Sequence, residues 1–549
     1  MHPLARLRAR LSFARSRLRF LAVFVLAWVT ASARSATPAP EFAAGISNGV
    51  VGTYNVTEAS GLVVSRQSPG VLWTHNDSGS RGSVFALATN GTYLARHYIP
   101  DVFTGDFEDI SVGPGPLAQF QYVYLGDIGD NPLTRTNIRV FRFPEPAVLA
   151  YQTNAPVDLP IFNAQEILLR YPDGPFNAEA MMVDPITGDL FITTKHTNTA
   201  RVYQATRAQL DSGALVTLTF VREINFRSAS GADISADGSM IAIRRPGRVG
   251  LWTRQAGQSV SNALVANPIT VPVIGQPDEP NGEAIAFDPN GLGYYTLSEG
   301  VTQPIYFFAR TDISPPVPRV FLGPGEEWQF NDFGFPPQPG WQTNLQGDFT
   351  LGLAPLGYGG GEQTPVSFGD AGAKYPTTYF LKTFSGDIVA SNLALRVIFN
   401  DGIAVYLNGA EILRRNLDVG ASYETYASAS NTNRARCWHS VPVNPALLRQ
   451  GENVISAEVH RFDADGPSLI FDLQLVEAKV DSPPRFTSRL ITNGVWSAAL
   501  QGPNGLSVRI DSSADLQNWS TNRFVILTNG VGAVTEPATN AARFFRIGE

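Results

Sequence analysis

The sequence contains very little cysteine, lysine or charge. Cys437 is the only cysteine among 549 residues, which excludes an intramolecular disulfide. HExxH, CxxC and His-x-His patterns are also absent, which argues against zinc. Charged residues make up 16% of the chain and the net charge is −7, so a nucleic-acid partner is not expected. Stability must come from hydrophobic cores, and a chain of this length can bury several.

Long hydrophobic runs are missing except for one near the N-terminus. Residues 21–29 are apolar, but this run is shorter than the roughly 20 residues that a membrane span needs. Arginines precede the run, and small residues at 31–33 offer a cleavage site. The pattern predicts a signal peptide over residues 1–33, with an uncleaved anchor helix as the alternative. We therefore expect a protein without a membrane span that is secreted or associated with the cell envelope.

Glycine, proline and aromatic residues are abundant. The chain holds 50 glycines, 39 prolines and 11% aromatic residues, as turn-rich all-β proteins do. Proline clusters at 314–318 and 482–484 interrupt the strand-like pattern and suit stiff linkers. These breaks predict three domains, at 42–313, 319–480 and 484–549, in a monomeric protein.

One short pattern recurs five times in the first of these domains: a polar or acidic residue, a small residue and an apolar run. The copies are E-A-S-G-L-V-V (58–64), D-F-E-D-I-S-V (106–112), N-A-E-A-M-M-V (177–183), S-G-A-D-I-S (230–235) and N-G-E-A-I-A-F (281–287). Strand-like repeats spaced about 50–70 residues apart predict a five- or six-bladed β-propeller. We expect residues 49–56 to complete the last blade and the extra length of the second repeat to follow Pro144.

A propeller would bring polar residues from every repeat to one mouth. Residues entering the first strand of a blade and residues leaving its second strand share one rim. The first set is Glu58, Asp106, Glu108, Glu179, Asp233 and Glu283; the second includes His75, Asn76, Asp77, Asp127, Asp130, Lys195, His196, Arg244 and Glu299. Crowded carboxylates raise one another's pKa unless a cation compensates them. The sequence therefore predicts an anionic site.

Calcium is the hard cation that this site would meet outside the cell, and it binds six to eight oxygens. Residues 127–131 form a candidate loop because Gly129 lets several oxygens converge, although the spacing is not that of an EF-hand. The alternative is that these Asp and Asn side chains cap turns.

Other polar residues of the mouth are candidates for ligand binding or catalysis. The predicted ligand-binding residues are Asn76, Lys195, Arg244 and Glu299, and the catalytic candidates are Glu179, Glu283, His75 and His196. Lys195 and Arg244 suit phosphate or carboxylate oxygens, or else they neutralise neighbouring acids. For the histidines the alternative is packing. A Gly-x-Ser-x-Gly motif is absent, which argues against a covalent serine mechanism.

The sequence predicts that the second and third domains are β-sandwiches. Asn408-Gly409 between apolar alternations predicts a hairpin, and alternation at 454–460 and 469–476 indicates half-buried strands. The short strands at 506–511, 524–527 and 543–547 predict a small immunoglobulin-like domain. Five aromatic residues of the second domain suit either a sugar-stacking platform or a core: Trp328, Trp341, Tyr358, Tyr406 and Trp438.

Six motifs of the first domain, in order, resemble a family of secreted bacterial propellers. They are W-T-H-N-D-S-G (73–79), D-F-E-D-I-S-V-G-P (106–114), G-D-I-G-D-N (126–131), Y-P-D-G-P-F-N-A-E-A-M (171–181), T-T-K-H (193–196) and S-E-G (298–300). That family is described as phytase-like, or "esterase-like activity of phytase". Residues 352–359, 378–384, 400–409 and 451–460 resemble galactose-binding-like jelly rolls. The tail at 510–519 and 542–547 resembles a C-terminal β repeat of large secreted proteins from the Verrucomicrobia–Planctomycetes group.

The resemblance implies a function for the acidic mouth. Propeller phytases hold several calcium ions in such a mouth and hydrolyse phosphate esters. The resemblance therefore implies that the metal ligands are Asp77, Glu108, Asp127, Asp130, Glu179 and Glu283. We expect a secreted modular protein that binds a small-molecule or polysaccharide ligand through this mouth. A calcium-dependent phosphoester or ester hydrolase and a non-catalytic scaffold or adhesion protein are the alternatives.

Overall fold

The computed structural model describes residues 39–78, 81–149, 157–313, 319–344, 347–386, 392–478, 484–492, 495–502, 507–527, 531–537 and 543–547. The predicted signal peptide and the proline cluster at 314–318 lie outside these residues. Contacts group residues 40–549 as one compact unit. Within the described residues the chain is all-β apart from α1 (Arg207–Leu210), α2 (Val260–Ala263) and two 3-10 turns, η1 (Thr432–Arg434) and η2 (Pro445–Leu447). No described helix has the length and apolar character to cross a membrane.

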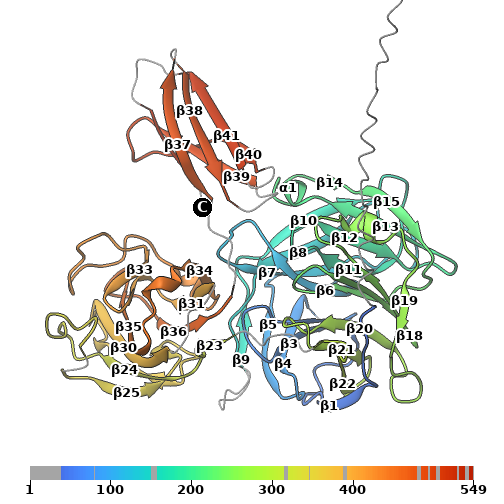
Figure 1. Ribbon diagram of the computed structural model, residues 1–549, viewed down its shortest axis with the longest axis horizontal. Helices are drawn as coiled ribbons and strands as arrows, with labels where there is room; N and C mark the ends of the chain where they lie inside the picture. Colours follow the sequence, from blue (N-terminus) through green and yellow to red (C-terminus); the bar gives the residue numbers. More distant parts are fainter. Residues whose placement is uncertain are drawn as a thin grey trace, which may run out of the picture. The chain divides into compact units, whose positions relative to one another are not determined.

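Residues 40–313 form five sheets of four or five strands (Figure 1, blue to green). The first contains β2 (Ala59–Val64), β3 (Val71–Asn76), β4 (Ser83–Ala88), β5 (Tyr93–Tyr98) and β9 (Val157–Pro160). The second contains β6 (Phe107–Pro114), β7 (Gln121–Asp127), β8 (Ile138–Pro144), β10 (Gln165–Arg170) and β14 (Val216–Thr217). The third contains β11 (Ala178–Val183), β12 (Leu190–Thr194), β13 (Ala200–Ala205) and β15 (Thr219–Ile224). The fourth contains β16 (Gly231–Ile234), β17 (Met240–Arg245), β18 (Arg248–Thr253) and β19 (Ile269–Val271), and the fifth contains β20 (Gly282–Phe287), β21 (Gly293–Ser298), β22 (Pro304–Ala309) and β1 (Ile46–Val50).

The five sheets contact one another in a closed order. Their first strands are neighbours in the sequence β2, β6, β11, β16, β20 and again β2. Each pair of successive sheets shares a hydrophobic cluster, and the cluster of Leu62, Phe85 and Leu297 joins the fifth sheet to the first. β1 pairs with β22, so the strand before the first repeat belongs to the last sheet. The extra length after Pro144 supplies β9, which pairs with β5.

Buried carboxylates connect the first strands, whose inner edges have no neighbouring strand in their own sheets. Asp109 accepts hydrogen bonds from the backbone N–H of Met181 (2.8 Å) and of Ala232 (3.0 Å). Asp233 accepts one from the N–H of Phe287 at 2.8 Å. Burial raises the pKa of Asp109 well above its ordinary value and that of Asp233 to about 6. Asp233, predicted to face the mouth, instead satisfies buried backbone groups between two sheets.

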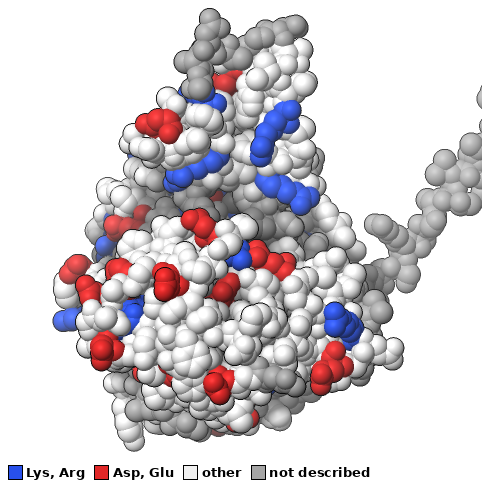
Figure 2. Space-filling model, turned by 90° about the vertical axis from the view of Figure 1, so that its left-hand side faces the viewer, with Lys and Arg blue, Asp and Glu red and all other residues white. Residues whose placement is uncertain are grey.

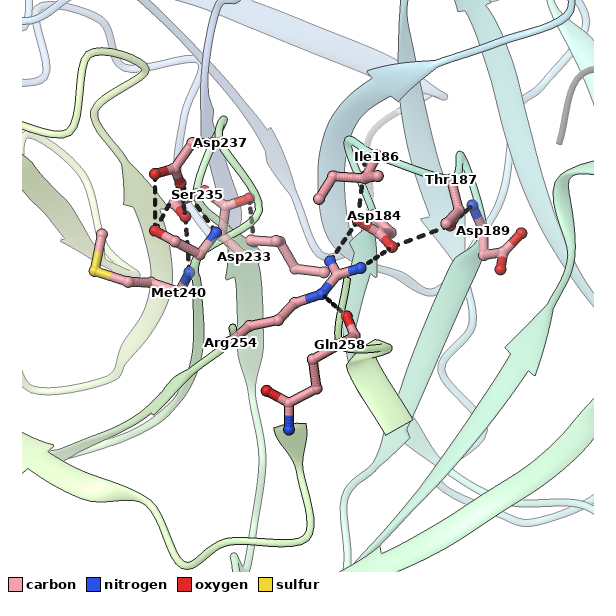
Figure 3. A network of polar contacts seen from close by, with 12 residues as sticks. Asp184, Ile186, Thr187, Asp189, Asp233, Ser235, Asp237, Met240, Arg254 and Gln258 are labelled. Atoms are coloured by element: carbon pink, nitrogen blue, oxygen red, sulfur yellow. Dashed lines mark hydrogen bonds and ion pairs between the residues drawn. The ribbon is translucent and has the colours of Figure 1, made fainter. Parts of the chain in front are cut away.

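A buried ion pair joins the third and fourth sheets at the turn that follows β11 (Figure 3). Arg254 donates to both oxygens of Asp184, at 2.7 and 3.0 Å. The same carboxylate accepts from the N–H of Ile186 and the hydroxyl of Thr187, so it also caps the turn. Both members of the pair are nearly inaccessible, at 5% and 2% side-chain exposure. A charge this deeply buried depends on its partner.

We expect Arg254→Ala to destabilise the protein strongly, because it leaves the Asp184 carboxylate buried with only its turn donors. Removing one partner of a buried pair costs about 3–5 kcal/mol. Urea unfolding followed by near-ultraviolet circular dichroism measures this loss. Arg170→Ala, at an exposed arginine bonded to Thr217, is the matched control and should change little. A loss below about 1 kcal/mol for Arg254→Ala would contradict a stabilising role.

Residues 319–478 form two six-stranded sheets and a short hairpin. One sheet contains β27 (Thr364–Pro365), β26 (Leu356–Tyr358), β36 (Leu469–Val476), β31 (Leu393–Phe399), β34 (His439–Val443) and β23 (Val320–Leu322). The other contains β25 (Thr350–Leu353), β24 (Glu327–Asn331), β30 (Thr377–Gly386), β35 (Gly451–His460), β32 (Gly402–Leu407) and β33 (Ala410–Arg415). The hairpin is β28 (Gly369–Asp370) with β29 (Ala373–Lys374). Both sheets contribute to one hydrophobic core that includes Trp328, Phe380 and Phe471.

The structure confirms the hairpin predicted at Asn408-Gly409. β32 and β33 pair on either side of these two residues, whose φ angles are 51° and 84°. Asn and Gly tolerate this left-handed conformation, which two-residue hairpin turns require. At Asn444 a single 3-10 turn, η2, begins, and the Asn444 side chain accepts from the N–H of Ala446.

The aromatic residues proposed for sugar stacking in this part mostly belong to the core. Trp328, Trp341, Tyr358 and Trp438 are all at most 8% exposed. The hydroxyl of Tyr406 donates to Glu458 at 2.8 Å. Cys437 is buried as well, and burial raises the pKa of its thiol to about 12, which leaves the thiol unreactive at neutral pH.

The C-terminal residues form two three-stranded sheets. One contains β37 (Arg485–Thr492), β38 (Val495–Gln501) and β41 (Val531–Pro537), and the other β40 (Ser520–Ile526), β39 (Ser507–Ser513) and β42 (Phe544–Ile547). Leu500, Val508, Ile510 and Leu527 form their shared core. No β-sheet includes strands from two of the three parts of the described chain.

Candidate metal and ligand site

Three glutamates occupy matching irregularities in the first strands of their sheets. The pairing register shifts around Glu108 in β6, around Glu179 in β11 and around Glu283 in β20. A bulge of this kind turns a side chain out of the regular alternation of the strand, often next to a functional site. In β16 the register is regular and the equivalent residue is Ala232. In these three sheets the repeat seen in the sequence therefore corresponds to a β-bulge that directs a glutamate side chain toward a shared site.

Glu108 forms an acidic triad with Asp77 and Asp106. Each residue offers a carboxylate oxygen, and these atoms all lie within 4.8 Å of one another. Asp77 follows β3 and Asp106 precedes β6, so the triad joins the first two sheets. Gly129 packs against it, since a Cβ at this position would lie 2.3 Å from Glu108 Oε1 and 2.4 Å from Asp106 Oδ2. Only glycine allows the loop to approach the carboxylates this closely.

The triad is only partly compensated, because burial raises the pKa of Asp106 although the nearby Arg135 lowers it in part. Glu108 is only 3% exposed, and Asp77 Oδ1 is buried without a hydrogen-bond partner. Burial, together with Glu179, Asp77 and Asp106, raises the pKa of Glu108 to about 11. Burial and the nearby Asp106 raise the pKa of Asp77 to about 7. Without a cation, Glu108 is therefore protonated at neutral pH and Asp77 is near its midpoint.

Lys195 joins the other two bulged glutamates. It makes an ion pair with Glu179 and lies 3.9 Å from Glu283 Oε1. Burial opposes the charge of Lys195, but the hydrogen bond to Glu179 and the surrounding carboxylates raise its pKa overall. Burial and Glu179 raise the pKa of Glu283 to about 8. Lys195 directly follows β12 in the third sheet, and its side chain approaches Glu283 in the fifth. The fourth sheet has Ala232 at the position equivalent to the three glutamates.

Two further acids border the cluster. Glu58 accepts from the hydroxyl of Ser78 at 3.0 Å, and Glu299 accepts from the side chain of Asn281 at 3.0 Å. Both raise the pKa of Asp77, and Glu299 also raises that of Glu283. The structure thus brings acids of the first, second, third and fifth sheets into one electrostatic group.

Asp127 and Asp130, predicted as metal ligands, have structural partners instead. Both oxygens of Asp127 pair with arginines, one with Arg135 at 2.7 Å and the other with Arg139. Asp130 caps the next turn by accepting from the N–H of Thr134 and of Arg135, both at 2.9 Å. These bonds engage both oxygens of each carboxylate. Asp130 therefore has the alternative role considered for this loop, which is the capping of a turn.

We therefore expect Asp127→Asn to lower the melting temperature by the same amount with calcium and with EDTA. The substitution weakens two ion pairs of a carboxylate that is 1% exposed, and this loss does not depend on a bound cation. Differential scanning fluorimetry under both conditions measures the effect. If Asp127 were a metal ligand, its substitution would instead abolish the calcium-induced shift.

Of the remaining predicted residues, His75, Asn76 and Arg244 are buried and His196 is exposed. His75 is buried and burial lowers its pKa to about 4, so it packs as a neutral side chain. Asn76 accepts from the N–H of Thr57 and of Glu58 and orders the loop before β2. Arg244 is fully buried, pairs with Glu279 and donates to the carbonyl of Ala284 at 2.6 Å. His196 is exposed, and its Nδ1 accepts from the N–H of Asn198.

The sequence-based set of metal ligands omitted Asp106, which completes the triad. The spacing of two residues between Asp106 and Glu108 does not by itself predict that their side chains lie together. A strand places residues two apart on the same face only when its register is regular. Arg135 and Arg139 were also missed as partners of Asp127. Nothing in the local sequence distinguishes an arginine that neutralises a carboxylate from one that faces solvent.

Figure 2 shows one face of the molecule. Among its described residues, acidic and basic side chains are scattered between large uncharged areas and form no continuous basic surface.

Comparisons with known proteins add little. No protein-family model matches the chain, and no curated protein matches it significantly. Among solved structures, a β-glucuronidase from an uncultured Clostridium sp. aligns with a TM-score of 0.21 and 10% identity over 43% of each chain. U3-55K aligns with a TM-score of 0.26 and 9% identity over 49% of this chain and 100% of its own. A Ruminococcus gnavus β-glucuronidase in complex with D-glucaro-d-lactam gives 0.20 and 10% over 42% and 43%. Likenesses this weak carry no argument about function.

Proposed function

We propose that residues 42–313 form a five-bladed β-propeller whose acidic end binds a divalent cation, calcium in an extracellular setting. The closed order of the five first strands and the five inter-sheet clusters support the propeller. We further propose that residues 319–480 form a galactose-binding-like jelly roll and residues 484–549 a small immunoglobulin-like domain. The motifs shared with phytase-like secreted propellers point in the same direction.

One observation carries the cation site: three carboxylates converge, and burial raises the pKa of each of them. Oxygens bound to one Ca²⁺ at about 2.3–2.6 Å lie at most about 5 Å apart, which accommodates the 4.8 Å limit of Asp77, Asp106 and Glu108. Glu108 is 3% exposed, and burial and the neighbouring acids make its ionisation costly unless a cation is bound.

The function that follows is that of a secreted modular protein which binds a small-molecule or polysaccharide ligand at the propeller mouth, with the cation as part of the site. Calorimetric titration of the full chain with calcium tests it. We expect stoichiometric binding that Glu108→Gln and Asp106→Asn abolish, while Glu424→Gln, at an exposed glutamate of the 319–478 part, leaves it unchanged. An absence of calcium binding in the wild-type protein would reject the proposal.

A calcium-dependent phosphoester or ester hydrolase is the second candidate, favoured by the groups beside the triad. When bound, a divalent cation polarises a scissile oxygen and activates water. Glu283, whose pKa is raised to about 8, can hold a proton at neutral pH and donate it to a leaving group. Lys195 supplies a positive charge for an anionic substrate.

We expect hydrolysis of chromogenic phosphate or carboxylate esters, if it occurs, to fall about 100-fold or more in Glu283→Gln, as loss of a general acid does. The comparison uses calcium-loaded protein and reports both kcat and KM. Calcium binding retained without turnover of any ester would leave a non-catalytic binding or scaffold protein as the function.

A further inference from the structure

A cavity lies beyond the ends of the first strands of the sheets, opposite to the ends that carry the acidic triad. Its volume is about 580 Å³, within the range of small-molecule sites. Its lining includes Arg66 after β2, Pro114 at the end of β6, Pro185 after β11 and Asp237 after β16. The acidic triad lies at the beginning of these strands, about 20 Å away for a strand of six residues. The two sites are therefore separate.

Arginine dominates the charge of this cavity. Arg66, Arg207 and Arg396 line it, and Asp237 is the one acid among the described lining residues; Arg207 also lies 4.0 Å from the buried Asp211. The carboxylate of Asp237 already accepts hydrogen bonds from the hydroxyls of Ser235 and Ser239. Three more acids lie near Arg66 or Arg396: Asp233, Asp288 and Glu145. Burial raises the pKa of each of them, and the charge of Arg66 opposes this shift.

Two of the guanidinium groups are incompletely satisfied. Arg66 donates through Nη2 to the carbonyl of Ile234 at 3.1 Å, but its Nη1 is buried without a hydrogen-bond partner. Arg396 in β31 has a buried Nε without a partner, and the described residues give its side chain no ion pair or hydrogen bond. Burial lowers the pKa of Arg396, and the nearby Glu145 offsets this only in part.

Neutral groups complete the wall. Gln67 donates through Nε2 to the hydroxyl of Ser440 at 2.6 Å, and its Oε1 is buried without a donor. The N–H of Ser440 donates to the carbonyl of Gln119 at 2.8 Å, which holds β34 against this end of the five sheets. Gln121 adds a further amide, and Phe120 adds an apolar face.

We propose that this cavity binds a small organic oxyanion that carries hydroxyl groups, a sugar acid or similar hydroxycarboxylate. Guanidinium groups recognise carboxylate and phosphate oxygens by paired hydrogen bonds. The amide and hydroxyl groups suit the hydroxyls of such a ligand, and an aromatic ring suits its apolar face. The inference does not depend on the cation site, because no residue is shared between the two.

The test is calorimetric titration of the full chain with sodium D-gluconate, inorganic phosphate and uncharged D-glucose, all in EDTA. We expect saturable binding of gluconate and no binding of glucose. Arg396→Gln should weaken gluconate about 10- to 100-fold, as loss of a charged hydrogen bond does. Arg170→Gln, the same change at an exposed arginine, should have no effect. Glu108→Gln should also bind normally, which separates this outcome from failure of the calcium site.

Ala118→Trp, which places a bulky side chain on the cavity wall, provides a second variant in case Arg396→Gln folds poorly. It should abolish gluconate binding while circular dichroism shows an intact fold. The proposal is overturned if wild-type protein binds no gluconate, if it binds phosphate alone, or if Arg396→Gln and Arg170→Gln behave alike.

Discussion

Calcium should raise the melting temperature of the wild-type protein by several degrees, and Glu108→Gln should remove this shift. A ligand that binds only the native state at one hundred times its Kd stabilises it by about 2.7 kcal/mol. Glutamine has the shape of the protonated glutamate, and the pKa of Glu108 is raised to about 11 by burial and neighbouring acids. The variant should therefore match or exceed the wild-type melting temperature in EDTA and differ only when calcium is present.

This pairing of results distinguishes a metal ligand from a structural residue. Asp127→Asn should lower stability under both conditions, whereas Glu108→Gln should change only the response to calcium. Gly129→Ala offers a steric test, because its methyl group would lie 2.3 Å from Glu108 Oε1 and disturb the triad without removing a charge. A calcium shift that persists in Glu108→Gln would rule out the triad as the binding site.

The second large effect concerns pH. Asp77 and Glu283 have folded-state pKa values raised to about 7 and about 8 by burial and neighbouring acids, whereas the unfolded chain loses these protons near pH 4. Between these values the folded state binds more protons than the unfolded state. The contribution of these groups to stability therefore falls as the pH rises from about 4 to about 8. We expect the melting temperature in EDTA to decrease across this window.

Calcium should reverse this trend, because binding requires ionised carboxylates and releases their protons. Glu108 releases one proton throughout the range from pH 6 to 8, and Asp77 releases a second below about pH 7. Each released proton raises the affinity about tenfold per pH unit, so we expect a gain of about a hundredfold or more from pH 6 to pH 8. Calorimetry in two buffers of different ionisation enthalpy counts the protons directly. An affinity independent of pH would contradict this ionisation scheme.

Several features were predictable from local sequence because local physics decides them. Asn408-Gly409 produced the hairpin that its preference for left-handed φ angles predicts. The five recurrences of a polar residue before an apolar run marked the first strands of five sheets. They also pointed to Glu108, Glu179 and Glu283 as equivalent residues, and the structure places all three on register shifts.

The roles of individual acids were not predictable in the same way. Asp127 and Asp106 look alike in sequence, yet one is neutralised by Arg135 and Arg139 and the other belongs to the triad. Asp233 resembles a mouth residue, but it satisfies the N–H of Phe287 in the next sheet. Each outcome depends on partners that are distant in the chain, and pair interactions across sheets leave no local pattern.

The sequence by itself determined the all-β character, the five repeats and the positions of the bulged glutamates, because strand alternation and turn chemistry act over a few residues. Only the tertiary structure decided which carboxylates lack partners and which arginines remain unpaired at the other end of the strands. The physical reason is that the charge state of a buried group depends on desolvation and on neighbours within a few ångströms, and the packing of separate sheets chooses those neighbours.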